Sequence, residues 1–158
     1  VDVFKQKEDA LAVFRRRKVG LIYQFYNLIP ILNVEENMIL PLMLDGKKVD
    51  KNYLKELINT LGLEKRINHL PNELSGGQQQ RVSIGRALIA RPDIILADEP
   101  TGNLDSKASK EIMELLKLSN QKYHQTIIMI THDMNLAKNA NRIITLEDGK
   151  IVKDEEIK

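Results

Sequence analysis

The chain has 158 residues, enough for one ordinary domain with its own core and too few for two. Hydrophobic residues make up 42% of it and charged residues 29%, a globular balance that excludes disorder as the main state. A net charge of +2 gives no indication of a nucleic-acid partner, and the longest apolar run, 38–44, is far shorter than the roughly 20 residues that span a bilayer.

The N-terminal part of the sequence predicts a short helix followed by a buried strand. Leu11 and Phe14 stand at helical spacing in a polar stretch that ends in the basic run 15–18, which we interpret as a solvated face. Residues 19–24 form a brief apolar run with β-branched and aromatic side chains. This composition favours a buried strand with Gln24 at its end.

The next segment is expected to be helical throughout. Asn33 stands three residues before Glu36, the offset of a helix cap, and Asp50 begins a clearer amphipathic helix that ends at Gly62. No part of the segment alternates between apolar and polar residues as a half-buried strand does. Residues from 33 to about 91 are therefore expected to form an all-helical insert within a sheet protein.

The C-terminal part of the sequence predicts a parallel sheet. Residues 94–97 and 126–130 are continuous apolar runs, which are typical of strands buried on both faces of such a sheet. The amphipathic segment between them predicts a helix that Asp105 can cap, so the order is strand, helix, strand. Residues 142–152 predict a hairpin on a two-residue turn.

Two acidic residues, Asp98 and Glu99, follow the apolar strand 94–97. In an open parallel sheet, ligands bind beyond the carboxyl ends of the strands. Because Pro100 restricts the backbone of Glu99, the chain is expected to turn there, so that both carboxylates can face this crevice. One carboxylate could hold a metal-bound water and the other could orient an attacking water, as in phosphoryl transfer with Mg²⁺. The alternative is a solvated turn after a buried strand.

Two further polar residues follow strands at the same expected edge. His132 comes after the strand 126–130, where its imidazole could donate a hydrogen bond to a phosphate oxygen. Gln24 could reach a metal or a water with its amide oxygen. A structural interpretation stays open for each residue, since His132 could simply stand at a helix start capped by Asp133, and Gln24 could be an ordinary strand-end residue.

The segment 74–78 combines a helix start with two glycines. Ser75 and Gln78 have the capping-box pattern, which by itself indicates an ordinary helix N-terminus. Gly76 and Gly77 each cost up to about 1 kcal/mol relative to alanine in a first helical turn, which favours a site where a ligand approaches the bare backbone. Exposed N–H groups at a helix start form an anion site, so a phosphate is the natural ligand.

These segments, taken in order, resemble the nucleotide-binding domain of ABC transporters, most of all the branch of exporters, lipoprotein release and antimicrobial-peptide resistance. The resemblance covers essentially the whole chain and assigns a motif to each segment: 23–25 the Q-loop, 74–81 the signature motif, 94–100 the Walker B strand, 102–105 the D-loop and 131–133 the H-loop. It implies a P-loop NTPase-like (RecA-like) α/β fold, a parallel sheet core with an all-helical insert. One departure is large: no G-x-x-x-x-G-K-[ST] occurs, so the Walker A region is absent and the domain is expected to be incomplete at its N-terminus.

The resemblance implies a role for each candidate residue in binding and hydrolysing ATP with Mg²⁺. Glu99 would polarise the attacking water, His132 would contact the γ-phosphate, and Gln24 would contact the metal and the water. Asp98 would hold the Mg²⁺ shell together with Gln24. The remaining residues would serve the nucleotide and interface of a second such domain arranged head to tail, and these are Ser75, Gly76, Gly77, Gln78 and Asp105.

The implied organisation has two parts, a core formed by residues 1–32 and 92–158 and a helical subdomain formed by residues 33–91, with the signature motif at its end. The complete domain would power a transmembrane permease from the cytoplasmic face of the membrane, which fits the absence of cysteine and of a visible signal peptide. Two alternatives stay open: an ABC-type ATPase without a permease, and a non-catalytic remnant that only binds a partner. The surface that docks the permease would include Leu28, Ile29 and Ile31, for which ordinary core packing is the alternative.

Overall fold

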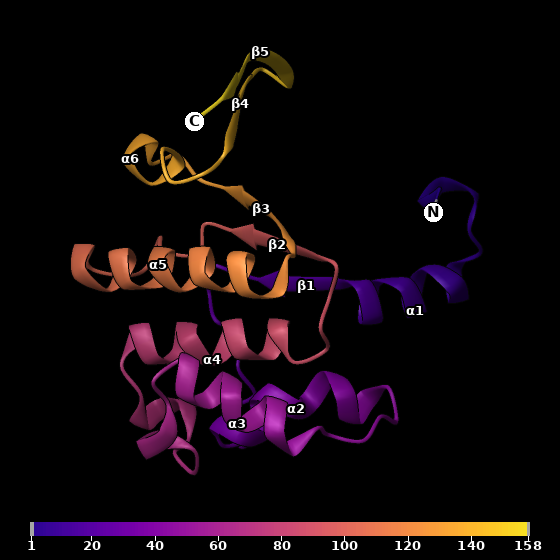
Figure 1. Cartoon of the computed structure of the whole chain (residues 1–158), viewed down its shortest axis with the longest axis vertical. Coiled ribbons are helices and arrows are strands. Elements are labelled where there is room, and N and C mark those ends of the chain that lie inside the picture. Colours follow the sequence, from indigo (N-terminus) through magenta and orange to yellow (C-terminus); the bar gives the residue numbers. More distant parts are fainter. Residues whose placement is uncertain (1, 158) are drawn as a thin grey trace.

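The computed structural model describes residues 2–157, which form an α/β fold (Figure 1). Its helices and strands, in chain order, are α1 (Glu8–Lys18), β1 (Val19–Ile22), α2 (Val34–Leu44), α3 (Lys51–Thr60), α4 (Gly76–Leu88), β2 (Ile94–Asp98), α5 (Ser106–Tyr123), β3 (Thr126–Ile130), α6 (Met134–Ala137), β4 (Arg142–Glu147) and β5 (Lys150–Glu156). Short 3₁₀ turns lie at Val3–Lys5, Glu64–Arg66 and Pro71–Glu73. The helices expected before and within the segment 33–91 are confirmed, and within the described residues that segment contains no strand.

The central sheet consists of parallel strands in the order β1-β2-β3, with β3 at an edge. Strand β2, helix α5 and strand β3 form the predicted βαβ unit, and Ile95 of β2 stands in register with Ile127 of β3. Strand β1 ends at Ile22, two residues earlier than predicted, so Gln24 lies beyond the strand. Strands β4 and β5 form the predicted antiparallel hairpin, a separate sheet.

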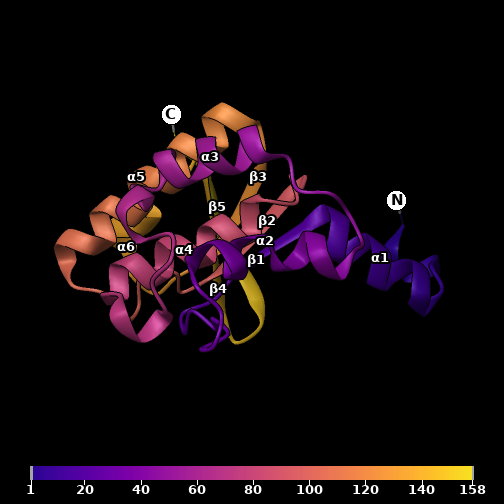
Figure 2. The ribbon, with the colours of Figure 1, turned by 90° about the horizontal axis from the view of Figure 1, so that it is seen from below.

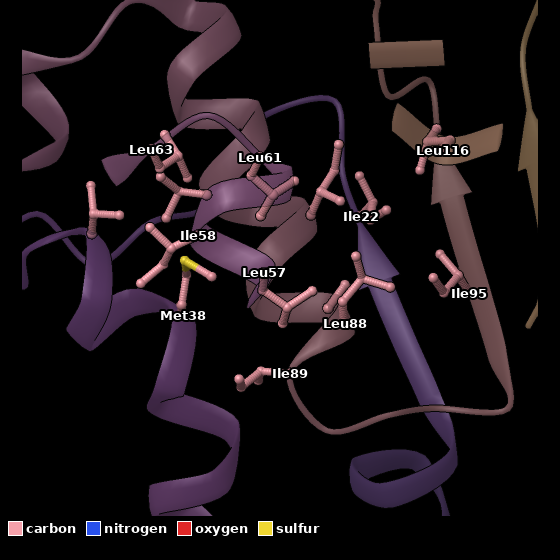
Figure 3. Packing of buried hydrophobic residues seen from close by; sticks show 14 of the residues in the cluster. Ile22, Met38, Leu57, Ile58, Leu61, Leu63, Leu88, Ile89, Ile95 and Leu116 are labelled. Atoms are coloured by element: carbon pink, nitrogen blue, oxygen red, sulfur yellow. The ribbon is translucent and has the colours of Figure 1, made fainter. Parts of the chain in front are cut away.

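The sheet is buried on one face only. Ile22, Ile95 and Ala97 are at most 2% exposed and belong to the core cluster. Figure 3 shows Ile22 and Ile95 packed against the helices. On the opposite face Leu96 of the central strand is 39% exposed, and Ile128 of β3 is 52% exposed. The prediction that these strands are buried on both faces is therefore wrong, because the helices of residues 2–157 that pack on the sheet cover one face.

The hydrophobic core lies between this buried face and the helices α2 to α5. Met38 of α2, Leu57 of α3 and Ile84 of α4 are fully buried in one cluster. The cluster continues from Met38 and Leu57 to Ile22 and Ile95 in the sheet (Figure 3). Helix α4 lies between α2 and the sheet (Figure 1). The division into a core and a helical subdomain stays a prediction, since one hydrophobic cluster extends across its boundary.

Helix α1 continues the line of β1 and projects from one side of the fold (Figures 1 and 2). Its C-terminal turn is fixed by Asp45, whose side chain is only 3% exposed and whose oxygens lie 2.7 Å from Arg16 Nε and 2.8 Å from Arg17 Nε. Lys47 Nζ lies 3.2 Å from the same carboxylate. Part of the basic run 15–18 is therefore engaged in ion pairs rather than only solvated.

Residues 2–157 include no helix that combines the length and the apolar character of a membrane span.

Candidate active site

The predicted polar residues meet at one edge of the sheet, where the parallel strands β1, β2 and β3 end. Asp98 is the last residue of β2 and Glu99 follows it. Gln24 lies two residues beyond β1, and His132 lies two residues beyond β3. The expectation that His132 lies beside the acidic pair is confirmed, because its ring contacts Glu99 directly.

Glu99 turns out of the strand with a left-handed backbone, φ 43°, a conformation that is strained for a residue with a side chain. Its N–H donates to the carbonyl of Ile130 at 3.0 Å, which fixes the turn to the end of β3. The carboxylate, 19% exposed, accepts from the His132 N–H at 3.0 Å through Oε1, and from the Thr131 hydroxyl at 3.4 Å through Oε2. The turn predicted at Pro100 thus directs Glu99 towards the end of the neighbouring strand.

The His132 ring lies mostly in solvent, with its side chain 85% exposed, while its Nδ1 lies 2.6 Å from Glu99 Oε1. A carboxylate only accepts hydrogen bonds, so Nδ1 carries the proton of this contact. In a neutral ring Nε2 is then an acceptor. A hydrogen bond from this ring to a phosphate oxygen therefore requires either the imidazolium form or release of Nδ1 from Glu99.

Asp98 and Gln24 offer oxygen atoms that suit Mg²⁺. Asp98 is exposed at the end of β2. The Gln24 side chain donates through Nε2 to Asn103 Oδ1 at 3.3 Å, and Asn103 donates back to the Gln24 carbonyl at 3.1 Å, so Gln24 Oε1 is turned away from this pair. Within residues 2–157 no group of three or more His, Cys, Asp or Glu side chains gathers as a metal site. Mg²⁺ commonly takes one or two protein oxygens and completes its shell with phosphates and waters, so these two residues fit a metal that arrives with a nucleotide.

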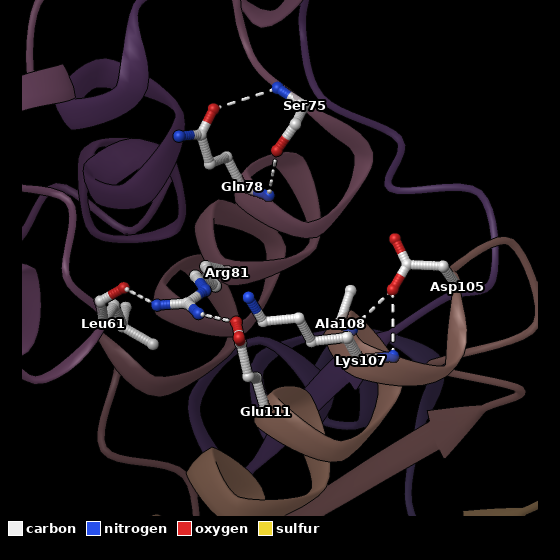
Figure 4. A network of polar contacts seen from close by, with 8 residues as sticks. All are labelled: Leu61, Ser75, Gln78, Arg81, Asp105, Lys107, Ala108 and Glu111. Carbon is white, nitrogen blue, oxygen red and sulfur yellow. Dashed lines mark hydrogen bonds and ion pairs between the residues drawn. The ribbon is translucent and has the colours of Figure 1, made fainter.

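The glycine-containing segment forms the N-terminus of α4 (Figure 4). Ser75 and Gln78 make the predicted reciprocal bonds, Gln78 N–H to Ser75 Oγ at 3.4 Å and Ser75 N–H to Gln78 Oε1 at 2.9 Å. The first N–H groups of a helix have no intrahelical acceptor, so those of Gly76 and Gly77 are available for an anion. They border a pocket of about 400 Å³ that Asp105 and Leu104 also line.

Gly76 is also required for packing, which could not be predicted from the sequence. A Cβ atom at Gly76 would lie 2.7 Å from the Tyr26 hydroxyl, so the segment after Gln24 packs directly on the helix start. Gly102 repeats this arrangement, because a Cβ atom there would lie 2.7 Å from Gln24 Nε2. Gly77 has room for a Cβ atom at ordinary contact distance. The interpretation of bare backbone for a ligand is therefore strongest at Gly77.

Asp105 caps α5 as predicted, accepting through Oδ1 from the N–H groups of Lys107 at 2.9 Å and Ala108 at 2.8 Å (Figure 4). Arg81 of α4 and Glu111 of α5, which form an ion pair at 2.6 Å, also line the pocket that Asp105 shares with the start of α4. A role of Asp105 towards a second domain stays a prediction.

Sequence reasoning assigned no role to Arg81, Glu111 or Gln80. Arg81 also donates to the carbonyl of Leu61 at 3.0 Å, so it ties α4 to both α3 and α5 (Figure 4). Gln80 is fully buried. This burial could have been predicted from the sequence, because Gln80 stands four residues before Ile84 and eight before Leu88, on the same helix face.

Comparisons with known proteins agree with this geometry. The sequence profile of the ABC transporter family matches residues 4–102. The ABC transporter ATP-binding protein MJ1508 of Methanocaldococcus jannaschii is 52% identical, covering 92% of this chain and 65% of the relative. The lipoprotein-releasing system ATP-binding protein LolD of Geobacter metallireducens is 43% identical, covering 97% of this chain and 69% of the relative. The chain thus spans about two thirds of the length of these relatives.

A solved structure shows the same fold. The ATP-binding cassette MJ0796, in a dimeric post-hydrolysis state bound to ADP and Pi, superposes with a TM-score of 0.83 at 44% identity, covering 98% of this chain and 69% of that one. The α/β architecture with a parallel sheet is accordingly that of the P-loop NTPases, as the resemblance implied. This chain belongs to the ABC transporter family and represents its ATP-binding domain.

Proposed function

We propose that this chain is part of the ATP-hydrolysing subunit of an ABC transporter, in which it powers a transmembrane permease. The observation that carries the proposal is the contact of 2.6 Å between the Glu99 carboxylate and the His132 ring, at the edge of the sheet where Asp98 also lies. A carboxylate that can accept a proton from water, an imidazole that can face a phosphate and an oxygen ligand for a metal suit phosphoryl transfer to water. The ADP and Pi bound to the similar cassette MJ0796 support ATP as the substrate.

In the proposed reaction Glu99 accepts a proton from the water that attacks the γ-phosphate. Its Oε1 is occupied by His132, whereas Oε2 has only the longer contact of 3.4 Å from Thr131. Oε2 is therefore the more accessible acceptor for the water. When His132 turns towards the nucleotide, its Nδ1–H becomes free to donate to a phosphate oxygen, while Glu99 Oε1 keeps the hydrogen bond from the His132 backbone N–H.

Asp98 and Gln24 would hold Mg²⁺, which neutralises charge on the phosphate oxygens when bound. Gln24 keeps its amide nitrogen on Asn103, so its oxygen can face the metal without loss of that contact.

The start of α4 would bind the nucleotide held by a second cassette. This helix start presents a hydroxyl, N–H groups and an amide to a pocket of about 400 Å³, from Ser75, Gly76, Gly77 and Gln78. The 158 residues contain no P-loop that could hold a nucleotide there. The dimeric state of the MJ0796 cassette supports pairing with a second cassette. In the head-to-tail arrangement that the resemblance implies, Asp105, on the same pocket, would lie at the interface.

The permease would dock next to Gln24, on the apolar side chains of the segment that follows β1. Phe25 is 69% exposed and Ile31 is 83% exposed, whereas Leu28 packs against the core. The name of the lipoprotein-releasing relative supports a transport function. The subunit would then lie on the cytoplasmic face of the membrane, held there by the permease.

The substitution Glu99→Gln in the complete cassette that carries this sequence tests the proposal. The amide keeps the shape of the side chain and cannot act as a base, so turnover of MgATP should fall about 10²- to 10⁴-fold while MgATP binding persists. Glu114→Gln, on the exposed surface of α5, is the matched control and should keep both properties. Phosphate release and nucleotide binding measure the two effects. Turnover of Glu99→Gln within a few-fold of the parent protein would contradict the assigned role.

A further inference from the structure

Gln80 of α4 is a fully buried glutamine that contacts two separate loops of the candidate site. Its Nε2 donates to the carbonyl of Tyr23 at 3.2 Å and to the carbonyl of Pro100 at 2.6 Å. Tyr23 directly precedes Gln24, and Pro100 directly follows Glu99. One amide group therefore joins the backbone beside Gln24 to the backbone beside Glu99.

The side-chain oxygen of Gln80 indicates that core packing alone does not explain a glutamine at this position. Gln80 Oε1 is buried and has no hydrogen-bond partner within residues 2–157. A buried polar atom without a partner destabilises a fold, and an apolar side chain on the same face as Ile84 and Leu88 would avoid this penalty. The amide is thus unfavourable as core packing and useful only for the two carbonyls that it holds.

Neighbouring contacts hold the same loop to α4 at its other end. Arg86 donates to the carbonyls of Tyr26 at 2.8 Å and Asn27 at 2.5 Å. The segment 23–27 is therefore fixed to α4 on both sides of Gln24 and Phe25. Of the two α4 residues that hold it, Gln80 also reaches Pro100 beside Glu99, whereas Gln24 itself contacts Asn103 further along the same turn.

We propose that Gln80 is a positioning residue that couples the Gln24 segment to the Glu99 turn. A displacement of the Gln24 segment by a docked partner moves the Tyr23 carbonyl, and Gln80 transmits this movement to Pro100 and to the backbone that aims Glu99. The proposal rests on the proposed function, since it assigns to Gln80 an effect on ATP hydrolysis. It predicts an effect on turnover and on its stimulation by the partner, and none on nucleotide affinity, because Gln80 is fully buried and does not line the pocket at the start of α4.

The test compares Gln80→Met with Ser83→Ala in the complete cassette, with and without its permease. Methionine has a similar length and no donor, so it releases both carbonyls while filling the same space. Ser83 is the matched control: it is fully buried in the same helix, and its hydroxyl makes no hydrogen bond to either carbonyl or to any other group of residues 2–157. Since small misplacements of catalytic groups can lower a rate about 10²-fold, we expect Gln80→Met to lower kcat at least about tenfold and to reduce stimulation by the permease. The KM of Gln80→Met for MgATP should stay within about twofold of the parent value. Ser83→Ala should keep the parent kcat and the parent KM.

Each outcome decides a separate point. If the parent cassette hydrolyses ATP and Gln80→Met keeps its kcat, or if Ser83→Ala loses as much, the role of Gln80 is refuted and the proposed function stands. If the parent cassette hydrolyses no ATP, the proposed function fails and the coupling fails with it. Should Gln80→Met not fold, Gln80→Leu, which is also apolar and has no hydrogen-bond donor, has to show the lowered kcat, and parent-like turnover of that variant would refute the role equally.

Discussion

Helices α2 and α4 begin with the same pair of reciprocal hydrogen bonds, which allows the role of Ser75 to be separated from helix capping. At α2 the Glu36 N–H donates to Asn33 Oδ1 at 2.9 Å, and at α4 the Gln78 N–H donates to Ser75 Oγ at 3.4 Å. Only the cap of α4 borders the pocket proposed for a nucleotide. We therefore predict opposite patterns for Ser75→Ala and Asn33→Ala.

The control substitution Asn33→Ala should lower the thermal stability more than Ser75→Ala does. Removing a helix cap costs about 0.5 to 2 kcal/mol, and Ser75 should lie at the lower end because its bond is longer. For a protein of this size 1 kcal/mol shifts Tm by about 2 to 4 °C. Asn33→Ala is thus expected to lower Tm by up to about 8 °C, and Ser75→Ala by only about 1 to 4 °C.

Activity should fall in the functional variant alone. A hydrogen bond to a charged group contributes about 1.5 to 3 kcal/mol, so loss of the Ser75 hydroxyl from a phosphate should lower kcat/KM for MgATP about ten- to hundred-fold. Thermal unfolding and steady-state phosphate release in the complete cassette measure the two quantities. If Ser75→Ala keeps the parent kcat/KM, or if both variants lose activity in proportion to Tm, then Ser75 acts only as a helix cap.

Other expectations concern the fold. Leu57→Ala, in the fully buried core, should lower the free energy of unfolding in chemical denaturation by about 2 to 5 kcal/mol. Leu118→Ala, on the exposed side of α5, should change it by less than about 0.5 kcal/mol, and similar losses in both variants would contradict the position of the core. A hydrogen bond from Arg17 lowers the pKa of Asp45 from 3.8 to about 2, so its ion pairs stabilise the fold above pH 3.8 and this contribution is lost as the pH falls through about 2. Asp45→Asn should therefore be less stable than the parent near neutral pH and equally stable below the lowered pKa, and a constant difference across a pH titration would refute this reasoning. In hydrogen exchange of the 158-residue chain, amides of the edge strand Thr126–Ile130 should exchange faster than those of α4, and equal, concentration-independent protection in a monomer would show that the edge is closed.

The sequence was sufficient for most elements of the fold because their signals are local. The Asn33 and Ser75 caps, the Asp105 cap and the apolar run of β3 each lie within a few residues of the element that they define. The meeting of Glu99 and His132 was also predictable, since parallel strands end at one edge of a sheet.

The failures concern contacts between distant segments. Continuous apolar runs indicate buried strands, yet burial depends on whether a helix lies on each face, and Leu96 is 39% exposed because its face has no such helix within residues 2–157. The contact of Gly76 with Tyr26 and that of Gln80 with Tyr23 join residues 50 and 57 positions apart, for which no local spacing rule exists.

Helix α4 connects the separate parts of the site because its successive residues point to different neighbours. Its N-terminus carries the cap and the glycines, Gln80 faces the turns beside Gln24 and Glu99, and Arg81 faces α5. A helix interior is rigid, since each turn is hydrogen-bonded to the next, so these groups cannot move independently. A tilt of α4 relative to the sheet would change the helix start that we propose faces a nucleotide and the aim of Glu99 together. Under the proposed coupling, a partner that pushes on the Gln24 segment, which α4 holds through Gln80 and Arg86, would act on both at once.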